Sequence, residues 1–330
     1  KIKNSENGKK ILIADRGRIE SIIKNYSAIK ILETKYDLNP LILTQEKKNT
    51  NINLLYESLG FKKIFKFSDE INLISIIFGF FFVFIKFCEC LKYFIKKDFL
   101  NFINNFKVSN VHIGDLIYDR YIRNDYKYLR PSFFDIKFLK FFFVCVYKTI
   151  FFEKYLKSKD ISLIIVNTHT YMNNYSILFK LSKKLRIDLL YLKDFQISFF
   201  KNGQYNREND PRILTKKKLE RIRFSKEKIN ELKKHMINRT KGRLEHFDVK
   251  AAFGEGKNKI DQLLKKKKIN LKKFKKKVLI ASHSLSDANH FYFEYNSRSF
   301  FYDYHTHLIK TLEFAKKNKK IFFLVRPHPS

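Results

Sequence analysis

The sequence has few cysteines, few glycines and no tryptophan. Its 330 residues include 3 cysteines, 9 glycines and 5 prolines, and no tryptophan. Cys88, Cys90 and Cys145 form neither a CxxC motif nor the spacing of a cysteine metal site, which argues against a disulfide framework and favours a reducing, cytoplasmic setting. Only Gly17 follows the first expected strand, so the GxGxxG fingerprint of dinucleotide-binding proteins is absent.

Acidic residues are also scarce. Lys+Arg 68 against Asp+Glu 32 gives a formal net charge of +36, which by itself suggests nucleic acid or an anionic surface. Lysine greatly outnumbers arginine, the better bidentate reader of phosphate, and its abundance beside Phe, Ile and Asn is typical of an AT-rich coding bias. Because no zinc-finger spacing, aromatic RNP strand or helix-turn-helix accompanies the charge, we do not expect nucleic acid as a partner. An anionic membrane surface or a nucleotide-linked substrate fits at least as well.

Short apolar segments alternate with helical patterns through the first 200 residues. The length and the 45% hydrophobic content indicate a folded chain of about two domains. The expected strands are 10–14, 41–44, 63–66, 111–113, 163–166 and 189–192, and the expected helices are 19–35, 51–59, 136–157 and 173–185. Such alternation is typical of a doubly wound parallel sheet. The sequence therefore predicts an α/β fold with a Rossmann-like N-terminal domain over 1–200.

Residues 71–85 are the most apolar part of the chain. A membrane-spanning helix needs about 20 apolar residues, and this segment is shorter and ends at Lys86, Glu89 and Lys92. An amphipathic pattern then continues to about residue 105. Three interpretations stay open: a long, partly buried core helix, which we favour, a helix whose aromatic face contacts a membrane interface, and a transmembrane segment.

A lysine-rich region precedes a second sheet. Residues 201–276 are expected to form a helical, solvated connection. A strand at 277–281, a helix at 301–316 and a buried strand at 321–325 follow, so 277–330 would begin a second Rossmann-like domain. The chain starts at Lys1 instead of Met and stops just after the last strand. We therefore expect it to be a piece of a longer reading frame, with the second domain incomplete.

The last expected strand is followed by Arg-Pro-His-Pro. Open α/β sheets bind ligands beyond the carboxyl ends of their strands, which is where Arg326 and His328 are expected. Pro327 and Pro329 fix φ and remove backbone donors, so the loop is stiff. A guanidinium and an imidazole held in this way suit a phosphate or a leaving-group oxygen. An ordinary turn with a surface histidine is the alternative.

Two further polar side chains follow expected strands. Asp115 comes after strand 111–113 and Gly114, and its carboxylate suits a general base or a binder of a substrate hydroxyl. The alternative for Asp115 is a helix N-cap. His169 follows strand 163–166 at the same kind of sheet edge, and the alternative for it is a polar surface residue.

Three segments share their order and spacing with a known family. They read HIGDLIYD at 112–119 with YIR at 121–123, LIASHSLSDA at 279–288 with FYDY at 301–304, and LVRPHP at 324–329. Together they resemble the GT-B glycosyltransferases of surface carbohydrate synthesis. The nearest likeness is to capsule polysaccharide biosynthesis proteins, with cousins among the CDP-glycerol glycerophosphotransferases.

The resemblance implies a GT-B-like architecture of two Rossmann-like domains that face each other across a cleft. The N-terminal domain would bind a glycan or lipid-linked acceptor, and the C-terminal domain a nucleotide-sugar donor. Asp115, or more weakly His169, would deprotonate the acceptor hydroxyl. The residues implied near the donor are Arg326, His328, Ser282, Ser284 and Asp287. No cofactor and no bound metal are implied, and the sequence has no Asp-x-Asp motif.

The expected function is therefore glycosyl transfer in capsule or other surface polysaccharide synthesis. The protein is expected in the cytoplasm, with peripheral contact to the inner face of an anionic cytoplasmic membrane. The alternative is a non-catalytic partner in polysaccharide assembly or export that keeps the same fold. Since the rest of the donor domain is missing, the fragment alone is expected to be inactive.

Overall fold

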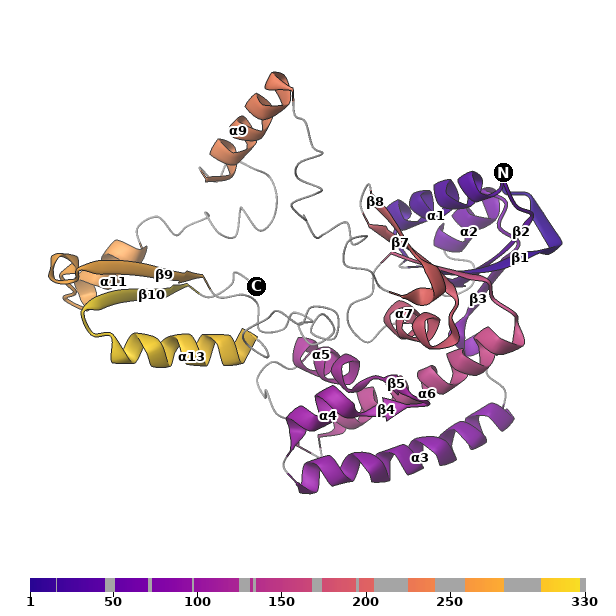
Figure 1. Ribbon diagram of the computed structural model, residues 1–330, viewed down its shortest axis with the longest axis horizontal. Helices are drawn as coiled ribbons and strands as arrows, with labels where there is room; N and C mark the ends of the chain where they lie inside the picture. Colours follow the sequence, from indigo (N-terminus) through magenta and orange to yellow (C-terminus); the bar gives the residue numbers. More distant parts are fainter. Residues whose placement is uncertain are drawn as a thin grey trace. The chain divides into compact units, whose positions relative to one another are not determined.

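The computed structural model describes the chain in two compact units (Figure 1). The described residues are 1–15, 17–44, 51–70, 73–96, 98–124, 131–132, 135–167, 174–193, 196–204, 225–240, 259–281 and 304–326. Of these, the residues up to 204 belong to the first unit and those from 225 onward to the second. The domain boundaries expected at residues 200 and 276 stay predictions.

A six-stranded sheet forms the centre of the first unit. Its strand order is β3-β2-β1-β6-β7-β8. All neighbouring strands are parallel except β7 and β8. The prediction of an α/β fold is confirmed, and the mostly parallel order is compatible with a Rossmann-like domain. The bounds are β1 Asn4–Ala14, β2 Leu38–Thr44, β3 Lys63–Lys66, β6 Leu163–Val166, β7 Asp188–Lys193 and β8 Gln196–Phe200.

The sheet that the sequence predicts to be parallel is mixed, because β8, a strand that the sequence does not predict, runs antiparallel to β7. Only two residues separate Lys193 from Gln196, and a parallel crossover needs about a dozen or more. The strand therefore returns antiparallel to β7. Its pattern is also atypical, because Ile197 and Phe199 are exposed whereas Ser198 is buried. Apolar and polar residues alternate over 197–199, but the apolar ones face outward, so the pattern does not mark the buried side of the strand.

β2 begins three residues earlier than expected and includes a proline. Pro40 pairs with Ile11 of β1, whereas β3 pairs with β2 only from Leu41 onward. The missing N–H of Pro40 therefore falls on a part of β2 that has a single sheet neighbour, where a proline costs little.

Helices cover both faces of this sheet (Figure 1). α1 (Ile19–Leu32) and α2 (Asn51–Ser58) lie on one face, and α7 (Asn174–Leu185) lies on the other. In α1, Ile22 and Ile29 lie on the same side of the helix and are both buried, as expected for a helix that packs one apolar side against a sheet. The core between α1, α2 and the strands includes Ile11, Ile13, Ile42, Tyr56, Phe61 and Ile165.

A layer of helices connects β3 to β6. It contains η1 (Phe67–Glu70), α3 (Leu73–Ile95), α4 (Phe99–Asn105), α5 (Gly114–Asn124) and α6 (Ile136–Ser158). The expected continuation of one helical pattern to residue 105 is interrupted after α3, because the Asp98 side chain caps α4 by accepting a hydrogen bond from the Asn101 N–H at 3.1 Å. Within the described ranges, no helix has both the length and the hydropathy to cross a membrane.

The strand expected at 111–113 does not belong to the main sheet. β4 (Lys107–Val108) and β5 (Val111–His112) form a separate antiparallel hairpin. Ser109 and Asn110 turn the chain with φ of 50° and 62°, as two-residue hairpin loops require. Because Ser-Asn is a weak turn signal, the sequence pattern does not reveal the hairpin. The expectation that Asp115 follows a strand of the main sheet is therefore wrong.

The second unit contains a parallel pair of strands and one packed helix. Its elements are α9 (Lys226–Thr240), α11 (Lys259–Lys266), η4 (Leu271–Lys273), β9 (Lys276–Ala281), α13 (Tyr304–Lys317) and β10 (Ile321–Arg326). β9 and β10 are parallel, and Phe314 of α13 contacts Phe323 of β10 with ring centroids 6.1 Å apart. The expected burial of the last strand is wrong: β10 is half-buried and Leu279 of β9 is 60% exposed.

Candidate functional site

The central strands of the six-stranded sheet meet where α/β proteins bind ligands. From β1 the sheet continues to β2 and β3 on one side, and from β6 to β7 and β8 on the other. This is a topological switch point, and ligands bind there beyond the carboxyl ends of the strands. Ala14 of β1 pairs with Val166 of β6. Asp15 and Asn167 are the next residues, so they leave the sheet side by side.

Asp15 is held by donors on two sides. It is 1% exposed, and its Oδ1 accepts a hydrogen bond from Tyr56 Oη of α2 at 2.8 Å. Its Oδ2 accepts from the Gly17 N–H at 2.8 Å. Gly17 has a φ of 70°, a conformation that glycine adopts without a steric cost and that turns its N–H toward the carboxylate. Asp15 acts as an acceptor in both contacts, as a carboxylate does.

Two asparagines extend this network to β6. Asn25 Nδ2 of α1 donates to Tyr56 Oη at 2.8 Å, and Asn167 Nδ2 donates to Asn25 Oδ1 at 3.1 Å. Asn25 and Tyr56 are fully buried, and Asn167 is 6% exposed. The hydrogen bonds run in one direction, from Asn167 through Asn25 and Tyr56 to Asp15. We call these four residues the switch-point network.

The switch-point network has one acceptor left over. Asn167 Oδ1 is buried and makes no hydrogen bond within the part of the chain that the structure describes. Since buried polar atoms are almost always paired, this oxygen is suited to a hydroxyl or N–H from a ligand or a water. Burial and the charge of Asp15 raise the pKa of Tyr56, so Tyr56 stays a protonated donor. The network can therefore accept a hydrogen bond from a hydroxyl or N–H group at this edge of the sheet.

The structure places Asp115 in a buried ion pair. Its Oδ2 lies 2.6 Å from Nζ of Lys180 on α7, and the two side chains are 1% and 3% exposed. Its Oδ1 accepts from the Leu116 N–H at 2.8 Å and lies 3.7 Å from Nδ1 of His112. Burial, together with the charge of Asp115, raises the pKa of the Cys145 thiol to about 12. A general base needs an open approach for its substrate, so this geometry favours a structural role for Asp115.

Arg326 lies at the end of the second sheet. It is the last residue of β10 and pairs in register with Ala281, the last residue of β9. Because the strands are parallel, the segments that follow them start from the same edge of the sheet. Arg326 is exposed, so a ligand at this edge can reach its guanidinium. The other predicted site residues lie outside the described residues; they are His169, Ser282, Ser284, Asp287 and His328.

The switch-point network is not among the predicted site residues, although the sequence carries two signals for it. Asp15 and Asn167 directly follow expected strands, which is the criterion that selects His169. Asn25 stands between Ile22 and Ile29 on the apolar face of α1, where a buried amide needs a partner. Neither signal identifies Tyr56, which reads as an ordinary aromatic core residue.

Comparisons with known proteins identify no relative. No protein-family model matches the sequence, and no match is found among curated proteins or among solved structures. The described ranges also contain no group of three or more His, Cys, Asp or Glu side chains that could hold a metal ion. The function is therefore argued from the geometry of the two sheet edges and from the resemblance of the three segments.

Proposed function

We propose that this protein is a glycosyltransferase that acts in capsule or other surface polysaccharide synthesis. The observation that carries the proposal is the parallel register of β9 and β10, which ends at Arg326. Sugar transfer from a nucleotide releases a nucleoside phosphate, and its developing negative charge needs a fixed cation. A guanidinium at the carboxyl end of a parallel strand supplies this charge. The low cysteine content suits a cytoplasmic location for such an enzyme.

The two units would divide the substrates between them, as in a GT-B architecture. The second unit would bind the nucleotide-sugar donor, with Arg326 and His328 at its phosphates and with Ser282, Ser284 and Asp287 in the segment that follows β9. The first unit would bind the glycan or lipid-linked acceptor. Its switch-point network supports this assignment, because Asn167 Oδ1 is a buried acceptor that a sugar hydroxyl can satisfy.

We assign the catalytic base to His169 in preference to Asp115. Asp115 is engaged by Lys180 at 2.6 Å, whereas His169 follows Asn167 by two positions and an imidazole titrates near neutral pH. In the transfer step the acceptor oxygen forms a bond to the anomeric carbon, and the bond from that carbon to the nucleoside phosphate breaks. The hydroxyl proton passes to the base, and the leaving phosphate keeps the electron pair beside Arg326.

A thermal-shift panel of CMP, CDP, UDP and GDP with the full-length protein tests the donor site. A nucleotide at about 100 times its dissociation constant stabilises by about 2.7 kcal/mol, which moves a melting temperature by a few degrees. We expect one nucleotide to produce the shift and Arg326→Ala to abolish it. Lys320→Ala, which changes an exposed lysine just before the opposite end of β10, is the matched control and should keep the shift.

A non-catalytic assembly or export partner is the second candidate. It is favoured by one observation, the buried ion pair that holds Asp115. If none of the four nucleotides shifts the melting temperature of a well-folded protein, the transferase proposal fails and this second candidate takes its place. Loss of glycan product on His169→Ala, with the melting temperature unchanged, would exclude the non-catalytic partner.

A further inference from the structure

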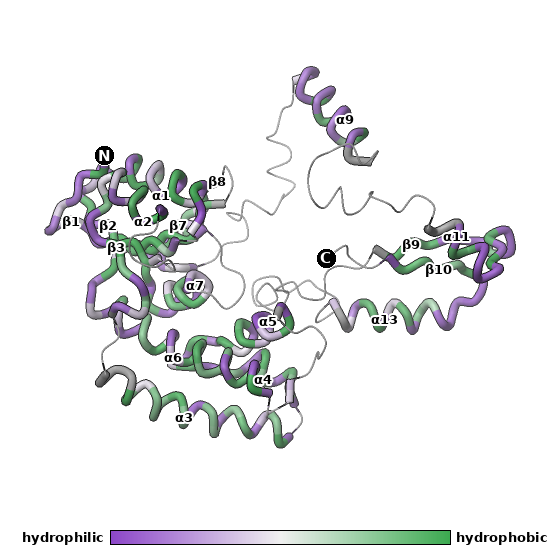
Figure 2. The backbone as a smooth tube through the Cα atoms, turned by 180° about the vertical axis from the view of Figure 1, so that it is seen from behind, coloured by the Kyte–Doolittle hydropathy of each residue, from purple (hydrophilic) through white to green (hydrophobic). Residues whose placement is uncertain are grey.

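The outward side of α3 is apolar and exposed. Side chains spaced by three and four residues share this side, whereas Val83 and Cys90 on the opposite side are 3% and 1% exposed. Figure 2 shows most of α3 in the green of hydrophobic residues, and both views place α3 beyond α6 at the outside of the first unit. We call the exposed residues the α3 aromatic face; they are Ile77 52%, Phe78 74%, Phe80 66%, Phe81 69%, Phe84 55% and Ile85 55% exposed.

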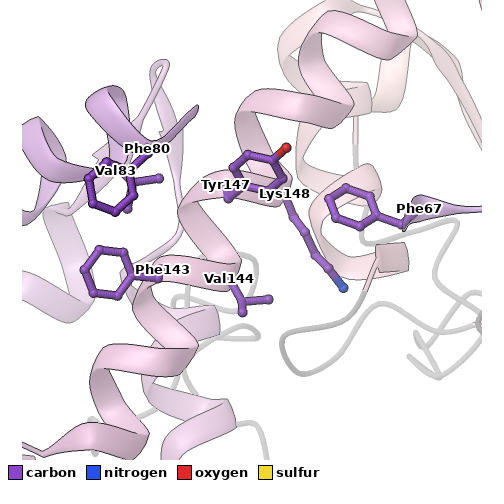
Figure 3. A pocket seen from close by; sticks show the side chains of 7 residues that line it. All are labelled: Phe67, Phe80, Val83, Phe143, Val144, Tyr147 and Lys148. Atoms are coloured by element: carbon purple, nitrogen blue, oxygen red, sulfur yellow. The ribbon is translucent and has the colours of Figure 1, made fainter. Parts of the chain in front are cut away.

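Two grooves flank the contact between α3 and α6. The larger has a volume of about 410 Å³, and its walls include Phe80 and Val83 from α3 and Phe143 from α6 (Figure 3). The smaller, of about 240 Å³, lies on the other side of Tyr147. The helices approach closely between the grooves because residue 79 is glycine: a Cβ at Gly79 would lie 2.3 Å from Cε2 of Tyr147.

Both grooves have hydrocarbon walls, and one lysine contributes to the lining of each. Lys148 lines the larger groove and Lys154 the smaller, and the Nζ of Lys148 lies 5.1 Å from the ring centroid of Phe67. The Nζ of Lys148 donates to Asn174 Oδ1 of α7 at 2.8 Å, and burial lowers the pKa of Lys148. Lys154 is exposed, so its ammonium is the one of the two that an anion outside the protein can approach. Tyr147 lines both grooves, and its Oη is buried with no hydrogen-bond partner among the residues described. A hydrocarbon chain with an anionic head group matches this combination.

We propose that the α3 aromatic face and its two grooves form a membrane-contact surface for an anionic bilayer. Lipid hydrocarbon enters the grooves, and lipid phosphate lies beside the exposed Lys154. Positive charge favours an anionic bilayer as the occupant. The chain carries a net charge of +36, and two lysines are exposed near the α3 aromatic face: Lys92 in the second half of α3 and Lys96 just after its end. A helix with Phe on one side and Lys nearby lies in the interface plane rather than across the bilayer. The surface is independent of the proposed transferase site.

Sedimentation of the full chain with vesicles tests the surface. We expect pelleting with vesicles of phosphatidylcholine and phosphatidylglycerol, and much less with phosphatidylcholine alone. The double variant Phe78→Ser, Phe81→Ser should bind the anionic vesicles about tenfold or more weakly. Its matched control is Ile23→Ser, Ile31→Ser, which removes two exposed apolar residues of α1 and should bind as the wild type does. Since both variants keep every lysine, a loss in the first alone isolates hydrocarbon contact from charge.

The absence of tryptophan permits a site-specific reporter in the same protein. Phe81→Trp should show a blue-shifted emission on addition of anionic vesicles, whereas Ile31→Trp on α1 should not. Failure of the wild type to pellet with either vesicle composition would overturn the proposal, as would equal binding of the Phe78→Ser, Phe81→Ser variant. A blue shift of Phe81→Trp that depends on protein concentration, without vesicles, would instead identify the face as a contact with a second copy of the chain.

Discussion

Replacing Asp115 by asparagine is expected to lower the free energy of unfolding by about 3–5 kcal/mol, the cost of breaking a buried ion pair on one side. The substitution preserves the size of the side chain but removes the charge that Lys180 contacts at 2.6 Å. Lys180 is 3% exposed, so its ammonium would stay in the protein interior without this carboxylate. Denaturant unfolding followed by circular dichroism measures the loss.

Two companion variants show whether the loss belongs to the buried pair. Glu20→Gln removes the partner of Lys24 in an exposed pair with side chains 68% and 22% exposed, and should cost less than about 1 kcal/mol. The double variant Asp115→Asn, Lys180→Met should lose less than the sum of its single changes, because the two side chains interact directly. If Asp115→Asn unfolds like the wild type and yet yields no glycan product, Asp115 is the base and the structural interpretation is wrong.

Tyr56→Phe is expected to lower the free energy of unfolding by about 2–4 kcal/mol, because two buried groups lose a hydrogen-bond partner at once. The hydroxyl donates to Asp15 Oδ1 and accepts from Asn25 Nδ2, each at 2.8 Å. A phenylalanine keeps the ring, which packs edge-on against Phe61 with ring centroids 5.2 Å apart. The substitution therefore measures the contribution of the hydroxyl alone. The same denaturant series measures the effect.

The control for Tyr56→Phe is the same substitution at an exposed tyrosine. Tyr36 is 46% exposed, and Tyr36→Phe should change the free energy of unfolding by less than about 0.5 kcal/mol. A similarly small effect at Tyr56 would mean that the switch-point network does not bind α1 and α2 to the strand ends. Nucleotide shifts should be the same in Tyr56→Phe and wild type, because the donor site is assigned to the second unit.

The elements that the sequence predicts well have strong local signals. Strands 10–14 and 163–166 are apolar runs, and both lie in the observed β1 and β6. The helix predicted at 136–157 is observed as α6, and the Asp135 carboxylate caps it by accepting from the N–H groups of Lys137 and Phe138. The errors at β5 and β8 have a common cause, because each strand pairs across a two-residue connection that lacks the glycine of the strongest hairpin signals.

The candidate site was predictable only in part for a similar reason. The strand ends that carry Asp15 and Asn167 follow from local pattern. The hydrogen bond that joins Asn167 to Asn25 links residues 142 positions apart, and no local pattern contains it. Asp115 illustrates the converse: its place beside Gly114 suggests an accessible carboxylate, but Lys180 on another helix encloses it.

The α/β class, the basic charge and the apolar segment that forms α3 all follow from the amino-acid sequence alone. Periodicity along the chain carries this information, because it specifies which residues share one side of a helix or strand. The pairing of Asp115 with Lys180, 65 positions away, and the exposure of the aromatic side of α3 depend on how the chain folds. Burial and ion pairing depend on which distant elements meet, and neither is a property of a local segment.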